Sequence, residues 1–205
     1  EGQARFYENI IGKSPEFWQI AYPVVLRHFP QLKQVPLEKF YMALMKVTPS
    51  VHRITADELT YSLHPILRFE MEKDWFDGKT KTKDFQEIWN AKYQEAFGLT
   101  PKDAREGVLQ DIHWASGHVG YFQSYTLGNL YGGMLLEAME QDIPQWEQQM
   151  AKGEFSAING WLYEHVHQYG IAIPPQQLLR QVTGKDLTEE PFLHYLRRRY
   201  LTKLR

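Results

Sequence analysis

The sequence predicts an all-α fold, organised as a single helical domain over residues 1–205. Apolar residues recur at spacings of three and four along most of the chain, which is the period of an amphipathic helix. Ser-Pro and Thr-Pro pairs precede several of these stretches, as expected at helix starts. Asn-Gly or Asp-Gly turns between alternating apolar runs, the usual hairpin signal, are not found.

The first third of the chain contains three predicted helical stretches. Phe6, Ile10 and Ile11 have helical spacing from the first residues, with no N-cap before them, so we expect this chain to be part of a longer one. Ser14-Pro15 begins a helix that reaches about residue 29, which Pro23 should kink or split. Pro36 begins the next helix, over residues 36–47.

A long helix is predicted from about residue 50 to residue 75, ending at Asp77-Gly78. It would place Arg53, Asp57 and His64 on one face, with Tyr61 beside them. One interpretation is an exposed Arg–Asp pair within the helix, which contributes little to stability. The other is a buried guanidinium, held by Asp57, that binds an anionic ligand group. The spacing alone favours the exposed pair.

The remaining helices follow in order. Thr82 or Asp84 begins a helix that ends at Phe97, with Gly98 as its stop, and Thr100-Pro101 is predicted to open another. A long helix is expected from residue 116 to about residue 141, where small residues such as Gly128 and Gly132 should allow a neighbouring helix to approach closely. Further helices are predicted over residues 144–150, 155–170, 174–182 and from 191 onward.

Composition excludes several classes of function. With 23 basic and 25 acidic residues, the net charge of −2 gives little support for a nucleic-acid partner. The chain has no cysteine, which excludes disulfides, thiolate metal sites and a cysteine nucleophile. Apolar runs stay well short of the roughly 20 residues that a membrane span requires. We therefore expect a cytoplasmic protein without nucleic-acid or membrane partners.

The stretch GVLQDIHWASGHVGYF, residues 107–122, is the most chemically concentrated part of the chain. It supplies polar groups beside aromatic walls, from Gln110, Asp111, His113, Trp114, Tyr121 and the nearby Tyr125. An imidazole or a phenol in such a place could stabilise an oxyanion. An aromatic-rich helix junction with satisfied polar groups would have the same composition. The residues alone do not distinguish between these two interpretations. The sequence contains no HExxH zinc motif.

Three motifs resemble those of the carboxypeptidase Taq family of metallocarboxypeptidases. GVLQDIHW is similar to the family motif GxxQDxHW, HRITAD resembles [IV]RxxAD, and EGQ resembles the last three residues of HE[SG]Q. The flanking text, ARFYENIIGKS and GYFQSYTLGN, is similar as well, so the resemblance covers essentially the whole chain. It implies a helical fold of the neurolysin and angiotensin-converting-enzyme type, and broad-specificity release of C-terminal residues from peptides with a free C-terminus.

The resemblance also implies roles for individual residues. Glu1 would be a metal ligand, and Arg53 would hold the terminal carboxylate of the substrate, although residue 52 is His where the family has Ile or Val. His113 would face the substrate or the tetrahedral intermediate. We select Tyr121 as the oxyanion donor, with Tyr125 as second choice. Substrate-binding roles are also predicted for the three other residues of the motif, Gln110, Asp111 and Trp114.

The family motifs HExxH, HPF and DxRxT are not in this chain. We therefore expect the C-terminal part of a longer enzyme, inactive alone, whose zinc or cobalt ion is not bound by this chain by itself. A missing N-terminal half could complement it as a separate polypeptide. Alternatively, the chain could be a non-catalytic helical module that binds peptide C-termini. Because members of the family are typically dimers, a homodimer is also expected.

Overall fold

The structure is a computed structural model that describes residues 1–201, in which helices are joined by turns and loops and no strand occurs. The all-α prediction is confirmed. Two compact units are present. The terminal unit consists of Glu1–Met45 and Gly128–Arg205, and the central unit of Lys46–Leu127. A single domain over the whole chain stays a prediction. Within the described residues, no helix is both long and apolar enough to cross a membrane.

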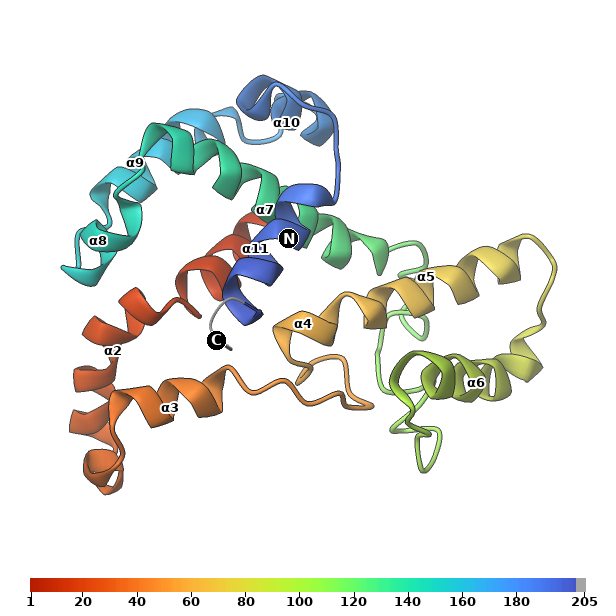
Figure 1. Cartoon of the computed structure of the whole chain (residues 1–205). Coiled ribbons are helices and arrows are strands. Elements are labelled where there is room, and N and C mark those ends of the chain that lie inside the picture. Colours follow the sequence, from red (N-terminus) through yellow and green to blue (C-terminus); the bar gives the residue numbers. More distant parts are fainter. Residues whose placement is uncertain (202–205) are drawn as a thin grey trace. The chain divides into compact units, whose positions relative to one another are not determined.

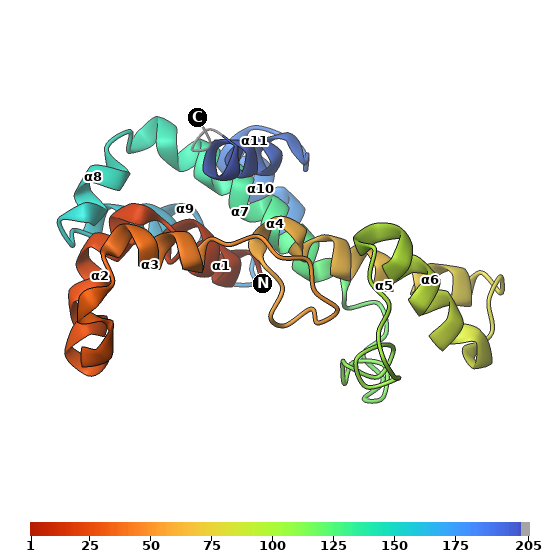
Figure 2. The ribbon, with the colours of Figure 1, turned by 60° about the horizontal axis from the view of Figure 1, so that its bottom comes forward.

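The terminal unit is built from helices at both ends of the sequence (Figure 1). Its first part contains α1 (Gly2–Arg5), the π-helix η1 (Phe6–Ile11), α2 (Pro15–His28), the 3-10 helix η2 (Pro30–Gln34) and α3 (Leu37–Leu44). Its second part contains most of α7 (Gln123–Asp142), then α8 (Trp146–Ala151), α9 (Ser156–His165), η4 (His167–Tyr169), α10 (Pro175–Thr183) and α11 (Glu190–Tyr200). Helix α8 packs beside α2, as Figure 2 shows.

One apolar core holds the terminal unit together. Phe6 of η1, Leu136 and Met139 of α7, Trp161 of α9 and Phe192 of α11 are among its buried members. Burying such side chains is the main favourable term in folding, at about 1.5–3 kcal/mol each. Segments from opposite ends of the sequence are therefore joined by a shared core.

Local signals at α2 act as the sequence predicts, with one exception. The Ser14 hydroxyl accepts a hydrogen bond from the Phe17 backbone N–H at 3.2 Å, so Ser14 is the N-cap, and Pro15 occupies the first helical position. Pro23 does not split the helix, which runs without interruption from Pro15 to His28. The proline removes one backbone donor, but the turns on either side keep theirs.

Small residues on α7 let other segments approach its backbone closely. A Cβ added at Gly128 would lie 3.1 Å from the backbone carbon of Glu1 and from the Gly2 nitrogen. A Cβ at Gly133 would lie only 2.6 Å from the Phe192 Cα. The predicted close approach at Gly128 is thus confirmed, and Gly133, which the sequence pattern did not single out, is the tighter of these two positions.

The central unit is formed by α4 (Glu58–Tyr61), α5 (Leu63–Phe76), η3 (Thr82–Asp84) and α6 (Phe85–Phe97), with long loops on either side. Helices α5 and α6 lie side by side (Figure 1). Their contact buries Leu67 and Met71 of α5 against Phe85, Trp89 and Tyr93 of α6. Helix α6 ends at Gly98, whose φ of 68° is left-handed, as predicted for its stop.

The predicted helix from residue 50 to residue 75 is wrong in its first part. Helix begins only at Glu58, because the Asp57 side chain accepts the Thr60 N–H at 2.9 Å and acts as the N-cap. Arg53 therefore lies in a turn before the helix, not one helical turn from Asp57. The predicted Arg53–Asp57 pair within a helix does not exist.

Two further helix predictions are wrong around residues 98–122, which form turns. The Asp103 carboxylate accepts the backbone N–H groups of Arg105 and Glu106, which stabilises a turn where a helix was expected after Pro101. Gly117 and Gly120 have φ values of 75° and 76°, which a helix cannot contain. For this reason α7 begins at Gln123 and not near residue 116.

Candidate functional site

Asp111 lies between two arginines in the interior of the central unit. Its Oδ1 accepts hydrogen bonds from Nε and NH2 of Arg53, at 3.0 and 2.7 Å. Its Oδ2 accepts the Nε–H of Arg68 at 2.7 Å, and NH2 of Arg68 lies 2.7 Å from the same oxygen. The side chains of Arg53, Asp111 and Arg68 are 9%, 6% and 0% exposed. We call these three residues the Arg-Asp-Arg cluster.

The three members of the cluster come from separate segments, two of which are connected by Gln110. Arg53 precedes α4, Arg68 is on the buried face of α5, and Asp111 is in the loop after α6. The side chain of Gln110 donates to the Val51 carbonyl at 2.8 Å, and its oxygen accepts the Arg53 backbone N–H at 2.9 Å. These bonds join the loop of Arg53 to the loop of Asp111 and fix their relative position.

Aromatic rings cover the guanidinium groups of the cluster. The Cζ of Arg53 lies 4.7 Å from the centroid of the Tyr125 ring, and the Cζ of Arg68 lies 4.4 Å from that of Trp89. Phe122 is near both cations, at 5.8 and 5.3 Å. Each ring presents the negative face of its quadrupole to a cation and shields it from water, which strengthens the electrostatics of the cluster.

A second layer of polar groups lies behind Arg68. Its NH1 donates to the His64 carbonyl at 2.8 Å and to the Tyr93 hydroxyl at 3.1 Å. Nδ1 of His64 is 2.9 Å from the same hydroxyl. Burial and the charges of Arg68 and Arg53 lower the pKa of His64 to about 3, so its imidazole is neutral at pH 7. NH1 of Arg53 donates to Tyr61 at 3.1 Å.

The cluster carries more positive than negative charge. Burial alone would raise the pKa of Asp111, but the charges and hydrogen bonds of Arg68 and Arg53 outweigh it and hold that pKa below its usual value. Burial lowers the pKa of Arg53, and its hydrogen bond and charge interaction with Asp111 raise it by more. These shifts favour the ionised forms of Asp111 and Arg53 at neutral pH, and two guanidinium groups face one carboxylate.

His113 extends the site toward the surface. Its Nε2 is 2.9 Å from the Tyr125 hydroxyl, and its ring packs 4.3 Å from the Phe122 centroid and 5.7 Å from that of Tyr121. Burial lowers the pKa of His113, which favours the neutral imidazole. Tyr121 is 42% exposed. Trp114 is oriented by its indole N–H, which donates to Glu72 at 2.7 Å.

The structure thus brings the predicted site residues of the central unit into one neighbourhood: Arg53, Gln110, Asp111, His113, Trp114, Tyr121 and Tyr125. Glu1 belongs to the terminal unit, where it is exposed and lies beside Gly128. Arg53 is buried, as the second interpretation of the sequence required, but its partner is Asp111 and not Asp57.

Sequence reasoning missed Arg68, the most buried cation of the site. A signal was available, because Arg68 falls on the stripe of α5 that also carries Leu67 and Met71, facing the core. Arginine is almost never fully buried unless it is paired. A lone arginine on an apolar helix face therefore indicates a partner elsewhere in the chain.

A metal centre requires a set of ligand side chains that lie close together in the structure. Among residues 1–201, no three His, Asp or Glu side chains are grouped so that they could hold a metal ion. Catalytic zinc sites use three protein ligands and keep one open position. Glu1 could supply one carboxylate ligand, and the sequence offers no cysteine.

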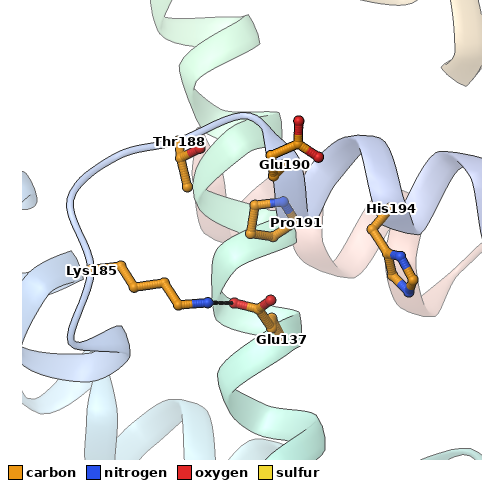
Figure 3. A pocket seen from close by; sticks show the side chains of 6 residues that line it. All are labelled: Glu137, Lys185, Thr188, Glu190, Pro191 and His194. Carbon is orange, nitrogen blue, oxygen red and sulfur yellow. Dashed lines mark hydrogen bonds and ion pairs between the residues drawn. The ribbon is translucent and has the colours of Figure 1, made fainter.

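A pocket of about 260 Å³ lies in the terminal unit, between α7 and the start of α11 (Figure 3). Lys185 and Glu137 are paired at 2.5 Å across it, and Glu190, Pro191 and His194 line its other side. None of the predicted site residues lines this pocket. Its lysine pairs with one of its two carboxylates, so it does not have the excess positive charge of the Arg-Asp-Arg cluster.

Comparisons with known proteins agree with the three motifs. The carboxypeptidase Taq (M32) metallopeptidase family matches residues 1–200. The chain is 40% identical over 201 residues to thermostable carboxypeptidase 1 of Pyrococcus furiosus and to carboxypeptidase 1 of Bacillus subtilis, covering 98% of this chain and 40% of each relative. A solved structure of Pyrococcus furiosus carboxypeptidase superposes with a TM-score of 0.95 at 40% identity, over 98% of this chain and 40% of that one.

The chain therefore spans about 40% of the length of the curated relatives that it matches. The match nevertheless includes nearly every residue of this chain, both in the family comparison and in the superposition on the solved structure. This chain belongs to the carboxypeptidase Taq (M32) metallopeptidase family.

Proposed function

We propose that this chain supplies the substrate-binding and oxyanion-stabilising part of a metal-dependent carboxypeptidase that releases C-terminal residues from peptides with broad specificity. The observation that carries the proposal is the Arg-Asp-Arg cluster, in which two buried guanidinium groups share one carboxylate. A buried site with excess positive charge favours an anionic ligand. A peptide with a free C-terminus presents such a group.

Arg53 is the residue that binds the terminal carboxylate of the peptide. Bonds to Asp111 and Tyr61 use three of the five N–H groups that a guanidinium carries. The other two can form a bidentate pair with a ligand carboxylate, a geometry that suits arginine better than lysine. Because Asp111 and the Tyr125 ring fix the plane of the guanidinium, little conformational entropy is lost when the ligand binds.

His113 and the two tyrosines form the proposed oxyanion wall. Tyr121 is the donor that we select, since its ring lies beside His113 and it is partly exposed. Tyr125 is the second choice, because its hydroxyl is 2.9 Å from Nε2 of His113. Donors placed where negative charge develops lower the barrier of peptide hydrolysis. Loss of one such donor typically reduces kcat by about 10²–10³-fold.

The other residues of the motif are proposed to position this wall. The polar groups of Gln110, Asp111 and Trp114 form hydrogen bonds to other protein groups, at 2.6–3.0 Å. Their contribution to substrate binding is then indirect, through the orientation of Arg53 and of the loop that carries His113. A substitution at these positions should weaken binding by loosening the site.

The metal of the complete enzyme is proposed to be zinc or cobalt, with Glu1 as one ligand. A bound metal of this kind polarises a carbonyl and activates water. The remaining ligands and the general base are proposed to come from a polypeptide segment outside this chain. This chain alone is then expected to be inactive. We also propose a cytoplasmic location, which a cysteine-free sequence suits, and self-association as a homodimer.

The first test measures carboxylate recognition by the chain itself. A fluorescently labelled tetrapeptide with a free C-terminus and the same peptide with a C-terminal amide are titrated with the protein, and anisotropy gives Kd for each. The free acid is expected to bind at least tenfold tighter. In Arg53→Met the free acid and the amide should bind equally well, because the remaining cation, Arg68, is neutralised by Asp111. Lys73→Met removes an exposed cation of α5 and should leave the ratio unchanged.

The second test measures catalysis. The purified chain with added zinc should release no C-terminal residue from an N-blocked peptide. Mixing it with the part of Bacillus subtilis carboxypeptidase 1 that it does not match should restore zinc-dependent release, and Tyr121→Phe should reduce that rate more than Tyr125→Phe. Zinc-dependent release by the chain alone would overturn the predicted inactivity. Carboxylate recognition without any complementation would favour the non-catalytic peptide-binding module.

A further inference from the structure

We propose that Arg68 is a positioning residue that sets both the orientation and the net charge of the carboxylate-binding site, acting on Arg53 through Asp111. The inference deepens the proposed function, because it rests on Arg53 as the group that binds the peptide carboxylate. Arg68 itself is fully buried and so cannot contact substrate. Any influence that it has on the ligand must pass through its neighbours.

The two oxygens of Asp111 are divided between the two arginines. Oδ1 accepts both of its bonds from Arg53, at 3.0 and 2.7 Å, and Oδ2 faces only Arg68 within the cluster, with both nitrogen contacts at 2.7 Å. A carboxylate held at both oxygens cannot rotate about its terminal bond without breaking an ion pair. Arg68 thus fixes the plane of the Asp111 carboxylate, and that plane fixes the guanidinium of Arg53.

Arg68 can act as an anchor because α5 and α6 hold it in place. Its NH1 donates to the His64 carbonyl on α5 and to the Tyr93 hydroxyl on α6, while the Trp89 ring of α6 lies 4.4 Å from its Cζ. His64 also contacts the Tyr93 hydroxyl through Nδ1, at 2.9 Å. The anchor is therefore part of the rigid helix pair, whereas Arg53 and Asp111 are on loops.

Charge gives Arg68 a second role. In an isolated Arg53–Asp111 pair the carboxylate would neutralise the guanidinium, and an incoming peptide carboxylate would gain little by binding. With Arg68 present, the three residues of the cluster together carry one net positive charge. Glu72, one turn further along α5, accepts the indole N–H of Trp114 at 2.7 Å and forms no ion pair with Arg68 among the described residues. The preference for a free C-terminus should then depend on Arg68.

The test compares Arg68→Met with the double variant Arg68→Met/Asp111→Asn. Removing Arg68 alone leaves a neutral Arg53–Asp111 pair, so the ratio of amide Kd to free-acid Kd should fall at least tenfold. Removing Asp111 as well restores one net positive charge but not the orientation that Arg68 sets, so the ratio should recover in part, to a value between those of Arg68→Met and the starting chain. If Arg68 only supported the fold, the double variant would be the weaker of the two. Far-UV circular dichroism checks that both are folded.

Matched variants separate the charge from the geometry. Arg68→Lys keeps the charge but loses the planar fork, so it should retain part of the carboxylate preference and gives a folded alternative if Arg68→Met does not fold. Lys73→Met removes a cation five residues along the same helix, where it pairs with Asp77 at the surface, and should have no effect. An unchanged ratio in folded Arg68→Met would overturn the proposal.

A second readout does not depend on peptide binding. The Nε–H resonance of Arg53, assigned by its disappearance in Arg53→Lys, should exchange slowly with water in the starting chain because that proton is bonded to Asp111. It should exchange at least tenfold faster in Arg68→Met and be unchanged in Lys73→Met. If the starting chain binds the free-acid peptide and the amide peptide equally well, the proposed function is contradicted. The exchange rate of the Arg53 Nε–H then still tests whether Arg68 positions Arg53. An unaffected signal in Arg68→Met shows that it does not.

Discussion

Replacing Asp111 by asparagine tests whether the Arg-Asp-Arg cluster is as buried and as strongly coupled as its geometry indicates. The substitution keeps the volume of the side chain and one carbonyl oxygen, so it removes charge without creating a cavity. Arg53 and Arg68 then face each other with no carboxylate between them, and their side chains are 9% and 0% exposed. Neither cation can turn to water without moving the surrounding loops or α5.

The magnitude follows from the degree of burial. Removing one partner of a buried ion pair typically costs about 3–5 kcal/mol, because the remaining charge stays desolvated. Asparagine can still accept a hydrogen bond from one guanidinium, which places the expected loss at the lower end, about 3 kcal/mol. With a urea dependence of about 1–3 kcal/mol per molar, the midpoint of unfolding of the central unit should fall by about 1–3 M.

The assay is urea unfolding at pH 7, followed by circular dichroism and by tryptophan fluorescence. Trp75, Trp89 and Trp114 belong to the central unit, and Trp18, Trp146 and Trp161 belong to the terminal unit, so fluorescence reports on both units. The part of the transition that shifts between the starting chain and Asp111→Asn is assigned to the central unit, which contains residue 111. Lys73→Met serves as the matched control, since its ion pair with Asp77 is at the surface and should contribute almost nothing. A loss below about 1 kcal/mol in Asp111→Asn would refute the reasoning, because a well-solvated pair would then describe the cluster better.

Two further predictions concern pH and packing. The folded pKa of His64 is about 3, below its ordinary 6.5, so the unfolded chain takes up a proton that the folded chain refuses. Stability should therefore fall as the pH drops below about 6.5, by up to about 1.4 kcal/mol per pH unit, and urea unfolding between pH 7 and 4.5 should show a shallower fall in His64→Gln. The lowered pKa of Asp111 acts separately: its contribution is present above about pH 4 and is lost below that value. Gly133→Ala should cost about 1–3 kcal/mol, since its Cβ would lie 2.6 Å from the Phe192 Cα, whereas Gly160→Ala in α9, with nothing within 4 Å, should stabilise by about 0.5–1 kcal/mol, both read as urea midpoints.

Local signals made much of the helical framework predictable. Ser14 caps α2 and Gly98 ends α6 through contacts with residues a few positions away, and such contacts depend mainly on the sequence nearby. The same kind of reasoning failed between Pro101 and Phe122. There the Asp103 carboxylate binds backbone N–H groups and two glycines have positive φ, and these turn contacts compete successfully with helix.

The amino-acid sequence by itself determined the all-α class, most helix ends, the family motifs and the stretch of chain that carries the candidate site. Only the tertiary structure decided which groups are partners. Arg53 binds Asp111, which is 58 residues away, instead of Asp57, which is four positions away, because Asp57 is used as the N-cap of α4. Arg68 reaches the same carboxylate across 43 residues. Side-chain pairs this distant are set by how α5, α6 and the loops pack, and helical periodicity carries no information about that packing.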